Sequence, residues 1–226
     1  MTGNDAQTNV ILNIFLKLTL LEEVLSFPEF LPKIFELTQH TKRSIQKEAC
    51  WTLSNITAGN PMQIEMILES TNYMQKFKTL VTSSHKDVKK INLFLKNSYS
   101  KVATEACWAI GNMISGATSE QIDRIVKDHG FVQLLPRLLT NHKSQVKQRG
   151  LEAILAILKA GGTTSENDYT QYIEDTDILD LIDGLIENPT LTAKAELILT
   201  YFETEEDEEN ENYQKIDINN ENSNSD

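Results

Sequence analysis

The sequence predicts an all-α fold built from stacked helical repeats, and two observations carry this prediction. The segment KEACWTLSNITAG at residues 47–59 recurs as TEACWAIGNMISG at residues 104–116, an offset of 57 residues. Apolar residues also recur every three or four positions over most of the chain up to residue 202, as they do along one face of a helix. Because repeated helical units bury their apolar faces against their neighbours, we expect a solenoid without strands.

Each copy of the repeated segment is expected to form a long helix with one polar stripe. At 3.6 residues per turn, positions i, i+3 and i+7 project from the same face. In both copies these positions hold a glutamate, a tryptophan and an asparagine: Glu48, Trp51, Asn55, Glu105, Trp108 and Asn112. A carboxylate and a carboxamide would need buried partners in a core. We therefore expect this stripe to be exposed and the opposite stripe to pack inward, with Ile45, Ala49, Leu53 and Ile56 in the first copy.

The chain is expected to begin inside a repeat unit. Residues 3–7 repeat the spacing of residues 59–63, which follow the first tryptophan helix. An earlier helix of the same kind is therefore expected to end just before residue 1. The helical pattern of residues 7–39 is broken at Pro28 and Pro32, because a proline ring has no amide hydrogen and interrupts or starts helices.

The next elements follow the repeat. Ser44 is expected to cap the first tryptophan helix, and Ser144 a third long helix. Residues 82–100 are interpreted as an insertion. The third unit loses the polar stripe, since the positions 42 residues after Glu105, Trp108 and Asn112 hold other residues. The expected helices span residues 45–58, 62–69, 73–81, 102–115, 119–128, 130–139 with Pro136 as an unfavourable residue, 144–160, 177–187 and 189–202, the last two sealing the stack.

Charge separates the chain into two expected parts. The net charge is −12, and residues 203–226 contain ten acidic residues and one lysine, which places −9 there and leaves −3 for the rest. That segment is rich in Asn, Glu, Asp and Ser, and too poor in apolar residues to order itself. We predict a repeat array over residues 1–202, comprising a partial first unit, two Trp/Asn units, one degenerate unit and a terminal helix pair. A disordered acidic tail is predicted over residues 203–226. The nearly neutral array argues against nucleic-acid binding.

Several classes of function are not supported by the sequence. No run of about 18 uncharged apolar residues and no signal-peptide pattern occurs, so we expect a soluble intracellular protein without membrane contact. Cys50 and Cys107 each directly precede a tryptophan, at equivalent positions on different helices. We therefore expect them to be reduced thiols that pack between helices rather than a disulfide pair. The four histidines are scattered, and no nucleophile, phosphate-binding loop or carboxylate pair stands out. We predict no enzyme activity, no metal and no cofactor.

The repeat resembles a known family. A period near 42 residues, three helices per unit and a short helix after a glycine are typical of armadillo repeats. Tryptophan followed four residues later by asparagine, within EACWTLSNITAGN and EACWAIGNMISG, resembles the C-terminal armadillo repeats of importin-α, the adaptor for nuclear localisation signals. The likeness extends from GNDAQTNVILN through GLEAIL to YFETEEDEE, about three quarters of the chain. It implies a right-handed armadillo superhelical solenoid.

The resemblance also implies a mechanism. In that family, tryptophans line a concave groove and hold lysine or arginine stems of an extended cargo peptide, while asparagines hold the peptide backbone. Trp51 and Trp108 match the tryptophans, Asn55 and Asn112 match the asparagines, and the glutamates that accompany them match acidic groove positions. Indole faces attract cations by roughly 0.5 to 2 kcal/mol per contact. By order from the C-terminus, these repeats resemble the minor cargo site.

The implied partners are proteins with lysine- and arginine-rich localisation signals and, through the last repeat and its acidic flank, the export receptor. Shuttling between cytoplasm and nucleus follows. The family's basic segment for importin-β and its major cargo site are absent from this sequence, so the chain alone is not expected to complete an import complex. Extra residues also occur around positions 14–30 and 84–99. Two alternatives stay open: an armadillo scaffold for another extended ligand, and a truncated fragment unable to support import.

Overall fold

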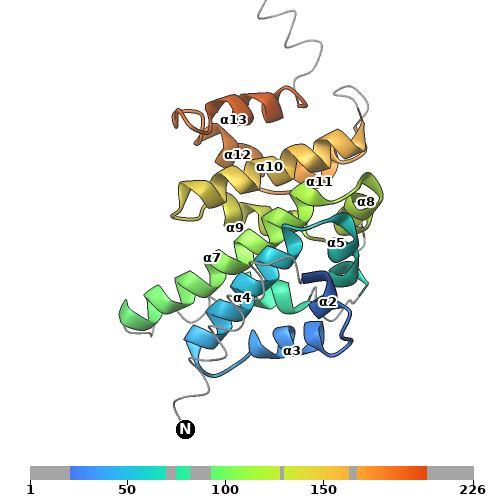
Figure 1. Ribbon diagram of the computed structural model, residues 1–226. Helices are drawn as coiled ribbons and strands as arrows, with labels where there is room; N and C mark the ends of the chain where they lie inside the picture. Colours follow the sequence, from blue (N-terminus) through green and yellow to red (C-terminus); the bar gives the residue numbers. More distant parts are fainter. Residues whose placement is uncertain (1–20, 70–74, 82–92, 128–129, 163–166, 203–226) are drawn as a thin grey trace, which may run out of the picture.

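The computed structural model describes residues 21–69, 75–81, 93–127, 130–162 and 167–202 (Figure 1). The predictions for the start of the chain and for the acidic tail after residue 202 lie outside the described residues, as do those for residues 82–92. All statements on structure below concern the described part.

The described chain is a succession of helices. Three are long, and each is flanked by shorter ones. The helices are α2 (Leu21–Leu25), α3 (Phe30–Leu37), α4 (Arg43–Thr57), α5 (Pro61–Leu68), a further helix at residues 75–81, α7 (Leu93–Gly116), α8 (Ser119–Lys127), the 3-10 helix η1 (Val132–Leu134), α9 (Leu135–Leu139), α10 (Ser144–Gly161), α11 (Thr170–Glu174), α12 (Ile178–Asp183) and α13 (Thr192–Leu199).

The long helices form one layer of the stack. Figure 1 shows α4, α7 and α10 side by side in chain order, with α13 beyond α10, and each packs on the next. The short helices α5 and α8 pack against each other, and α9 packs against α10 and α12. In the described residues the sole β feature is an isolated bridge between Gly162 and Asn167. The prediction of an all-α armadillo solenoid is confirmed.

The apolar core runs through the stack because each long helix buries a stripe toward both neighbours. Burying one such aliphatic side chain contributes about 1.5–3 kcal/mol. The inward stripe of the first tryptophan helix is mostly confirmed: Ala49, Leu53 and Ile56 are buried, whereas Ile45 is half-buried. Fully buried side chains of the three long helices include Leu53, Ile56, Ile110, Met113, Ile154 and Ile157.

The short helices after the tryptophan helices begin with the same polar device. At α5 the Asn60 side chain accepts from the Gln63 amide at 3.0 Å, and the Gln63 side chain accepts from the Asn60 amide at 3.2 Å. At α8, Thr118 and Gln121 exchange equivalent bonds at 3.1 and 3.3 Å. These reciprocal bonds satisfy amides that a helix N-terminus leaves without intrahelical partners.

Two of the expected helix caps are wrong. Ser44 and Ser144 lie inside α4 and α10, and the capping positions are Lys42 and Lys143, neither with a side-chain cap. In both places the amide of the capping lysine donates to a side chain two residues earlier, to His40 Nδ1 and to Asn141 Oδ1, each at 3.0 Å. These bonds fix an extended residue before the helix, so the helix starts earlier than the serine predicts.

Other expectations also changed. The backbone of α7 is already helical from residue 93, so the second tryptophan helix extends into the segment interpreted as an insertion. Between the expected helices at residues 144–160 and 177–187, the structure has the additional short helix α11, which buries Ile173. Pro136 is compatible with its position because it lies in the first turn of α9, where its missing amide hydrogen breaks no helical bond.

Candidate functional site

The six residues singled out by the repeat lie on neighbouring helices. Glu48, Trp51 and Asn55 belong to α4, and the other three belong to α7, which packs directly on α4. All six side chains are half-buried, between the buried stripe and the exposed flanks of their helices. We call this set, Glu48, Trp51, Asn55, Glu105, Trp108 and Asn112, the Trp–Asn stripe. The stripe was expected to be exposed; it is only partly so, because the neighbouring long helices cover one side of it.

The two asparagines differ in their contacts. The Asn112 side-chain amide donates to the backbone carbonyl of Ser54 on α4 at 2.9 Å. This bond crosses between repeat units, so Asn112 helps to hold α7 against α4. The Asn55 carboxamide makes no hydrogen bond within the described part of the chain. Equal spacing in the sequence therefore conceals unequal contacts: within the described residues only Asn112 uses its carboxamide to join two helices, while Asn55 uses none of its donor and acceptor capacity.

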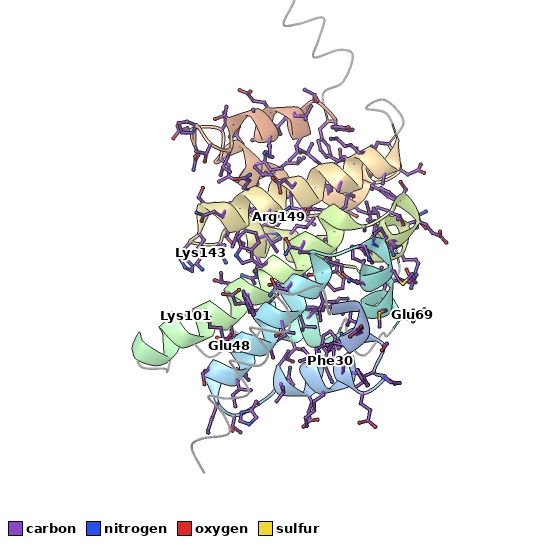
Figure 2. All side chains as sticks on the ribbon, in the orientation of Figure 1. Phe30, Glu48, Glu69, Lys101, Lys143 and Arg149 are labelled. Atoms are coloured by element: carbon purple, nitrogen blue, oxygen red, sulfur yellow. The ribbon has the colours of Figure 1, made fainter. Side chains whose placement is uncertain are left out.

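The carboxylates of the stripe face lysines of the protein itself. Glu48 pairs with Lys47 at 3.0 Å on the partly exposed surface of α4. Burial raises the pKa of Glu105, while Lys143 and Lys47 lower it and Glu48 raises it further. Figure 2 labels Glu48 on α4 and Lys143 at the start of α10, on either side of α7. These electrostatic interactions link three successive long helices along the stripe.

The two indoles have different surroundings. The guanidinium of Arg149, from α10, lies 5.8 Å from the centroid of the Trp108 ring. Arg149 also pairs with Glu152 one turn later at 2.8 Å, and Figure 2 labels it between α10 and α7. Trp108 packs against the apolar core as well. Among the described residues no cation lies over the Trp51 ring, so the two indoles differ in whether a cation of the protein contacts them.

The sequence analysis did not identify Arg149 as a residue of the site. The positions that correspond to Glu105, Trp108 and Asn112 in the third unit are Lys147, Gly150 and Ile154. The loss of the polar triplet there is consistent with burial of the last two, and Gly150 lies against Leu138 and Leu139. The sequence did contain one signal for it. Arg149 directly precedes Gly150, the position equivalent to Trp108, on the helix expected to stack on α7. Its partner could not be inferred without the packing of α10.

Other chemistry is sparse in the described residues. Cys50 and Cys107 are buried free thiols, and burial raises the pKa of each to about 12. The expected packing role of both cysteines is thus confirmed. Where side chains are described, no three His, Cys, Asp or Glu residues gather as metal ligands. The described helices also lack the length and hydrophobicity needed to span a bilayer.

Comparisons with known proteins agree with this architecture. The Armadillo/beta-catenin-like repeat family matches residues 31–58, which include all of α4 and all but the first residue of α3. Importin subunit alpha-4 of Arabidopsis thaliana is 34% identical over 182 residues, covering 76% of this chain and 31% of that protein. Importin subunit alpha-1a of Oryza sativa subsp. japonica is 42% identical over 71 residues, 31% of this chain and 11% of that protein.

A crystal structure of an engineered protein supports the fold. It covers 89% of this chain and 75% of its own, with a TM-score of 0.65 and 23% identity. The chain spans about a third of the length of importin subunit alpha-4. The matched relatives are importin subunits rather than enzymes.

Proposed function

Because this chain belongs to the importin-α family of armadillo-repeat proteins, we propose that it binds short lysine- and arginine-rich nuclear localisation peptides. The peptide lies extended across α4 and α7 on the Trp–Asn stripe. The stripe corresponds to the minor cargo site that the family resemblance implies, and the chain acts as an adaptor for basic cargo.

One observation carries this proposal: two helices that stack on each other present the same glutamate, tryptophan and asparagine at the same spacing. An indole face attracts a cation, a carboxamide offers both a donor and an acceptor to a peptide backbone, and a carboxylate pairs with a basic head group. An extended peptide advances about 3.3 Å per residue and turns alternate side chains to one face. A periodic ligand of this kind fits a periodic stripe.

The proposed contacts are few, which sets the expected affinity. Two indoles and two carboxamides engage only a short peptide, so binding is weak and falls as salt rises. Asn55 is the carboxamide most available to the peptide backbone, since Asn112 already bonds to Ser54. Trp51 is the first candidate for a lysine or arginine stem, since no cation of the described residues lies over its ring, whereas Arg149 lies over Trp108.

The test is a titration of the purified chain with a fluorescently labelled lysine-rich signal peptide, next to a charge-matched scrambled peptide. The Trp51→Ala/Trp108→Ala double variant should lose binding, because truncating an aromatic anchor typically costs about 2 kcal/mol or more. Circular dichroism serves as the control for folding. Undiminished binding by a folded double variant would refute the assignment to the stripe.

The wider partners follow from the same proposal. Cargo proteins with basic localisation signals are the main class, and shuttling between cytoplasm and nucleus accompanies an adaptor role. Binding of the export receptor is assigned to α12, α13 and the acidic segment that follows them. A pull-down with the chain, with and without residues 203–226, tests that assignment separately from peptide binding.

A further inference from the structure

The two halves of the Trp–Asn stripe are not equivalent, and Arg149 is the cause. Its guanidinium lies over the Trp108 ring at 5.8 Å from the centroid, the place where the proposed function puts a cationic stem of the ligand. Within the described residues no cation lies over Trp51. Arg149 thus already makes, at Trp108, the cation–π contact that a basic side chain of the ligand would make at Trp51.

Arg149 is held in this place by several contacts. Its guanidinium pairs with Glu152 at 2.8 Å on the same helix and lies against the Trp108 ring. Gly111 of α7 provides the space for its stem, because a Cβ atom at Gly111 would lie 2.5 Å from Arg149 Cγ. The absent side chain at residue 111 lets the arginine lie close against α7.

The carboxylates of both halves face cations of the protein, so the difference between the halves lies at the indoles. Lys143 acts on Glu105 from the start of α10, so the carboxylate beside this indole also faces a cation of the protein. A ligand lysine at Trp108 would have to displace Arg149 and approach Lys143. At Trp51, no cation of the described residues lies over the ring, and the nearby Glu48 carboxylate pairs with the partly exposed Lys47.

We propose that Arg149 is an internal occupant of the Trp108 ring that closes this half of the stripe to basic side chains and leaves Trp51 to select one. This inference rests on the proposed function for its ligand class. The specificity that follows is a single required lysine or arginine, with a neutral residue facing Trp108. Arg149 is thereby a specificity-determining residue rather than an anchor for the ligand.

The spacing of the helices defines the peptides for the test. Packed helices lie about 8–10 Å apart, and an extended chain covers this span in roughly two to three residues. One peptide series therefore carries a single lysine, and a second carries another lysine two or three positions away. The parent should bind both series alike.

Arg149→Ala should gain between about twofold and thirtyfold for the two-lysine peptide, the range expected for one new cation–π contact. Lys159→Ala is the matched control, since it removes the same charge from an exposed site on the same helix, about 15 Å away. Arg149→Lys should restore the behaviour of the parent, because an ammonium can also lie over an indole. The proposal would be overturned if the second lysine increased the affinity of the parent protein as much as it increases that of Arg149→Ala.

A second measurement decides the occupancy of the ring without any peptide. In a Trp51→Phe background, Trp108 is the sole tryptophan and its fluorescence is quenched with caesium ions. Arg149→Ala should raise the quenching constant about threefold at low salt, since a unit charge near 6 Å repels another cation to about that extent in water. Gly111→Ala should increase quenching by neutral acrylamide, because its methyl group displaces the arginine.

The outcomes separate the two proposals. Equal caesium quenching in Arg149→Ala and Lys159→Ala, with both variants folded by circular dichroism, would show that Arg149 does not cover Trp108. Failure of every variant to bind either peptide would contradict the proposed function instead, and the quenching result would still decide the role of Arg149.

Discussion

At the scale of single residues, the sequence repeat predicts on which helix and face a residue lies, but not which residues it contacts. The spacing correctly put three stripe residues on one face of each of two long helices, but all six are half-buried rather than exposed. It treated Asn55 and Asn112 as equals, and the structure distinguishes them, because the carbonyl that receives the Asn112 amide belongs to the preceding unit. Contacts of this kind depend on how two helices stack, which one helix pattern does not contain. The same limit applies to Arg149 over Trp108.

The asparagine contrast gives a stability prediction. Asn112→Ala should lower the free energy of unfolding by about 1 kcal/mol, because it removes an interhelical hydrogen bond and leaves the Ser54 carbonyl without that donor. The melting temperature should fall by about 2–4 °C. Asn55→Ala should change the free energy of unfolding by less than about 0.5 kcal/mol. Thermal denaturation followed by circular dichroism measures both, and equal losses in the two variants would contradict the assigned roles.

Glu105 gives a prediction on pH. Burial raises its pKa, so the folded state binds this proton more tightly than the unfolded state does, and stability falls as pH rises through the raised pKa. Glu105→Gln removes the charge and keeps the shape. The variant should melt up to a few degrees higher than the parent at neutral pH, and the difference should vanish near pH 4, where unfolded glutamate titrates.

The same substitution should weaken the salt dependence of basic-peptide binding, because one carboxylate of the stripe is gone. Melting curves over a pH series, together with peptide titrations at two salt concentrations, test both effects. A parent that is more stable than Glu105→Gln at neutral pH would mean that the ionic contacts from Lys143 and Lys47 outweigh burial.

At the scale of helices, the sequence predicted which segments form helices better than it predicted where those helices begin and end. The 3.6-residue pattern located every long helix, since a buried stripe requires it. Both serine caps were wrong, because His40 and Asn141 fix the residue before the helix in their place. The short helix α11 was missed, since its five residues TQYIE bury only Ile173 and offer little periodicity.

The cap residue Gln121 also connects two repeat units, which gives a prediction for α8. Its side-chain amide donates to the Pro61 carbonyl at 2.8 Å and to Glu65 at 2.9 Å, both on α5. Gln121→Ala should therefore lower the free energy of unfolding by about 2–3 kcal/mol, the sum of a cap and an interunit contact.

Gln63→Ala is the matched control for this prediction. It removes the equivalent cap bond at α5, and in the described residues the Gln63 side chain makes no hydrogen bond to another unit, so the change should cost about 1 kcal/mol. Urea denaturation of both variants measures the difference. A larger loss from Gln63→Ala would show that the bonds to α5 contribute nothing to the stacking of α8.

At the scale of the whole molecule, stability is expected to come from contacts between neighbours. Each long helix packs on the next, and the ion pair between Lys194 and Glu152, at 3.6 Å, joins α13 to α10. In such arrays the stability is approximately a sum over units and their interfaces. The acidic segment from residue 203 lies outside the described residues, and its predicted disorder rests on composition alone.

This arrangement predicts the effect of deleting residues 203–226. The segment carries −9 of the net −12 but few apolar residues, so its removal should leave the melting temperature nearly unchanged. Its charge can still attract basic peptides at low salt. Interactions between charges reach about 30 Å at 0.01 M salt, but only about 8 Å at 0.15 M, before they are screened. The truncated chain should therefore bind the signal peptide more slowly at low salt and equally well at physiological salt, as stopped-flow fluorescence would measure. A large loss of affinity at physiological salt would instead place the basic-peptide site on the tail, and a drop of many degrees in melting temperature would show that the tail packs on the array.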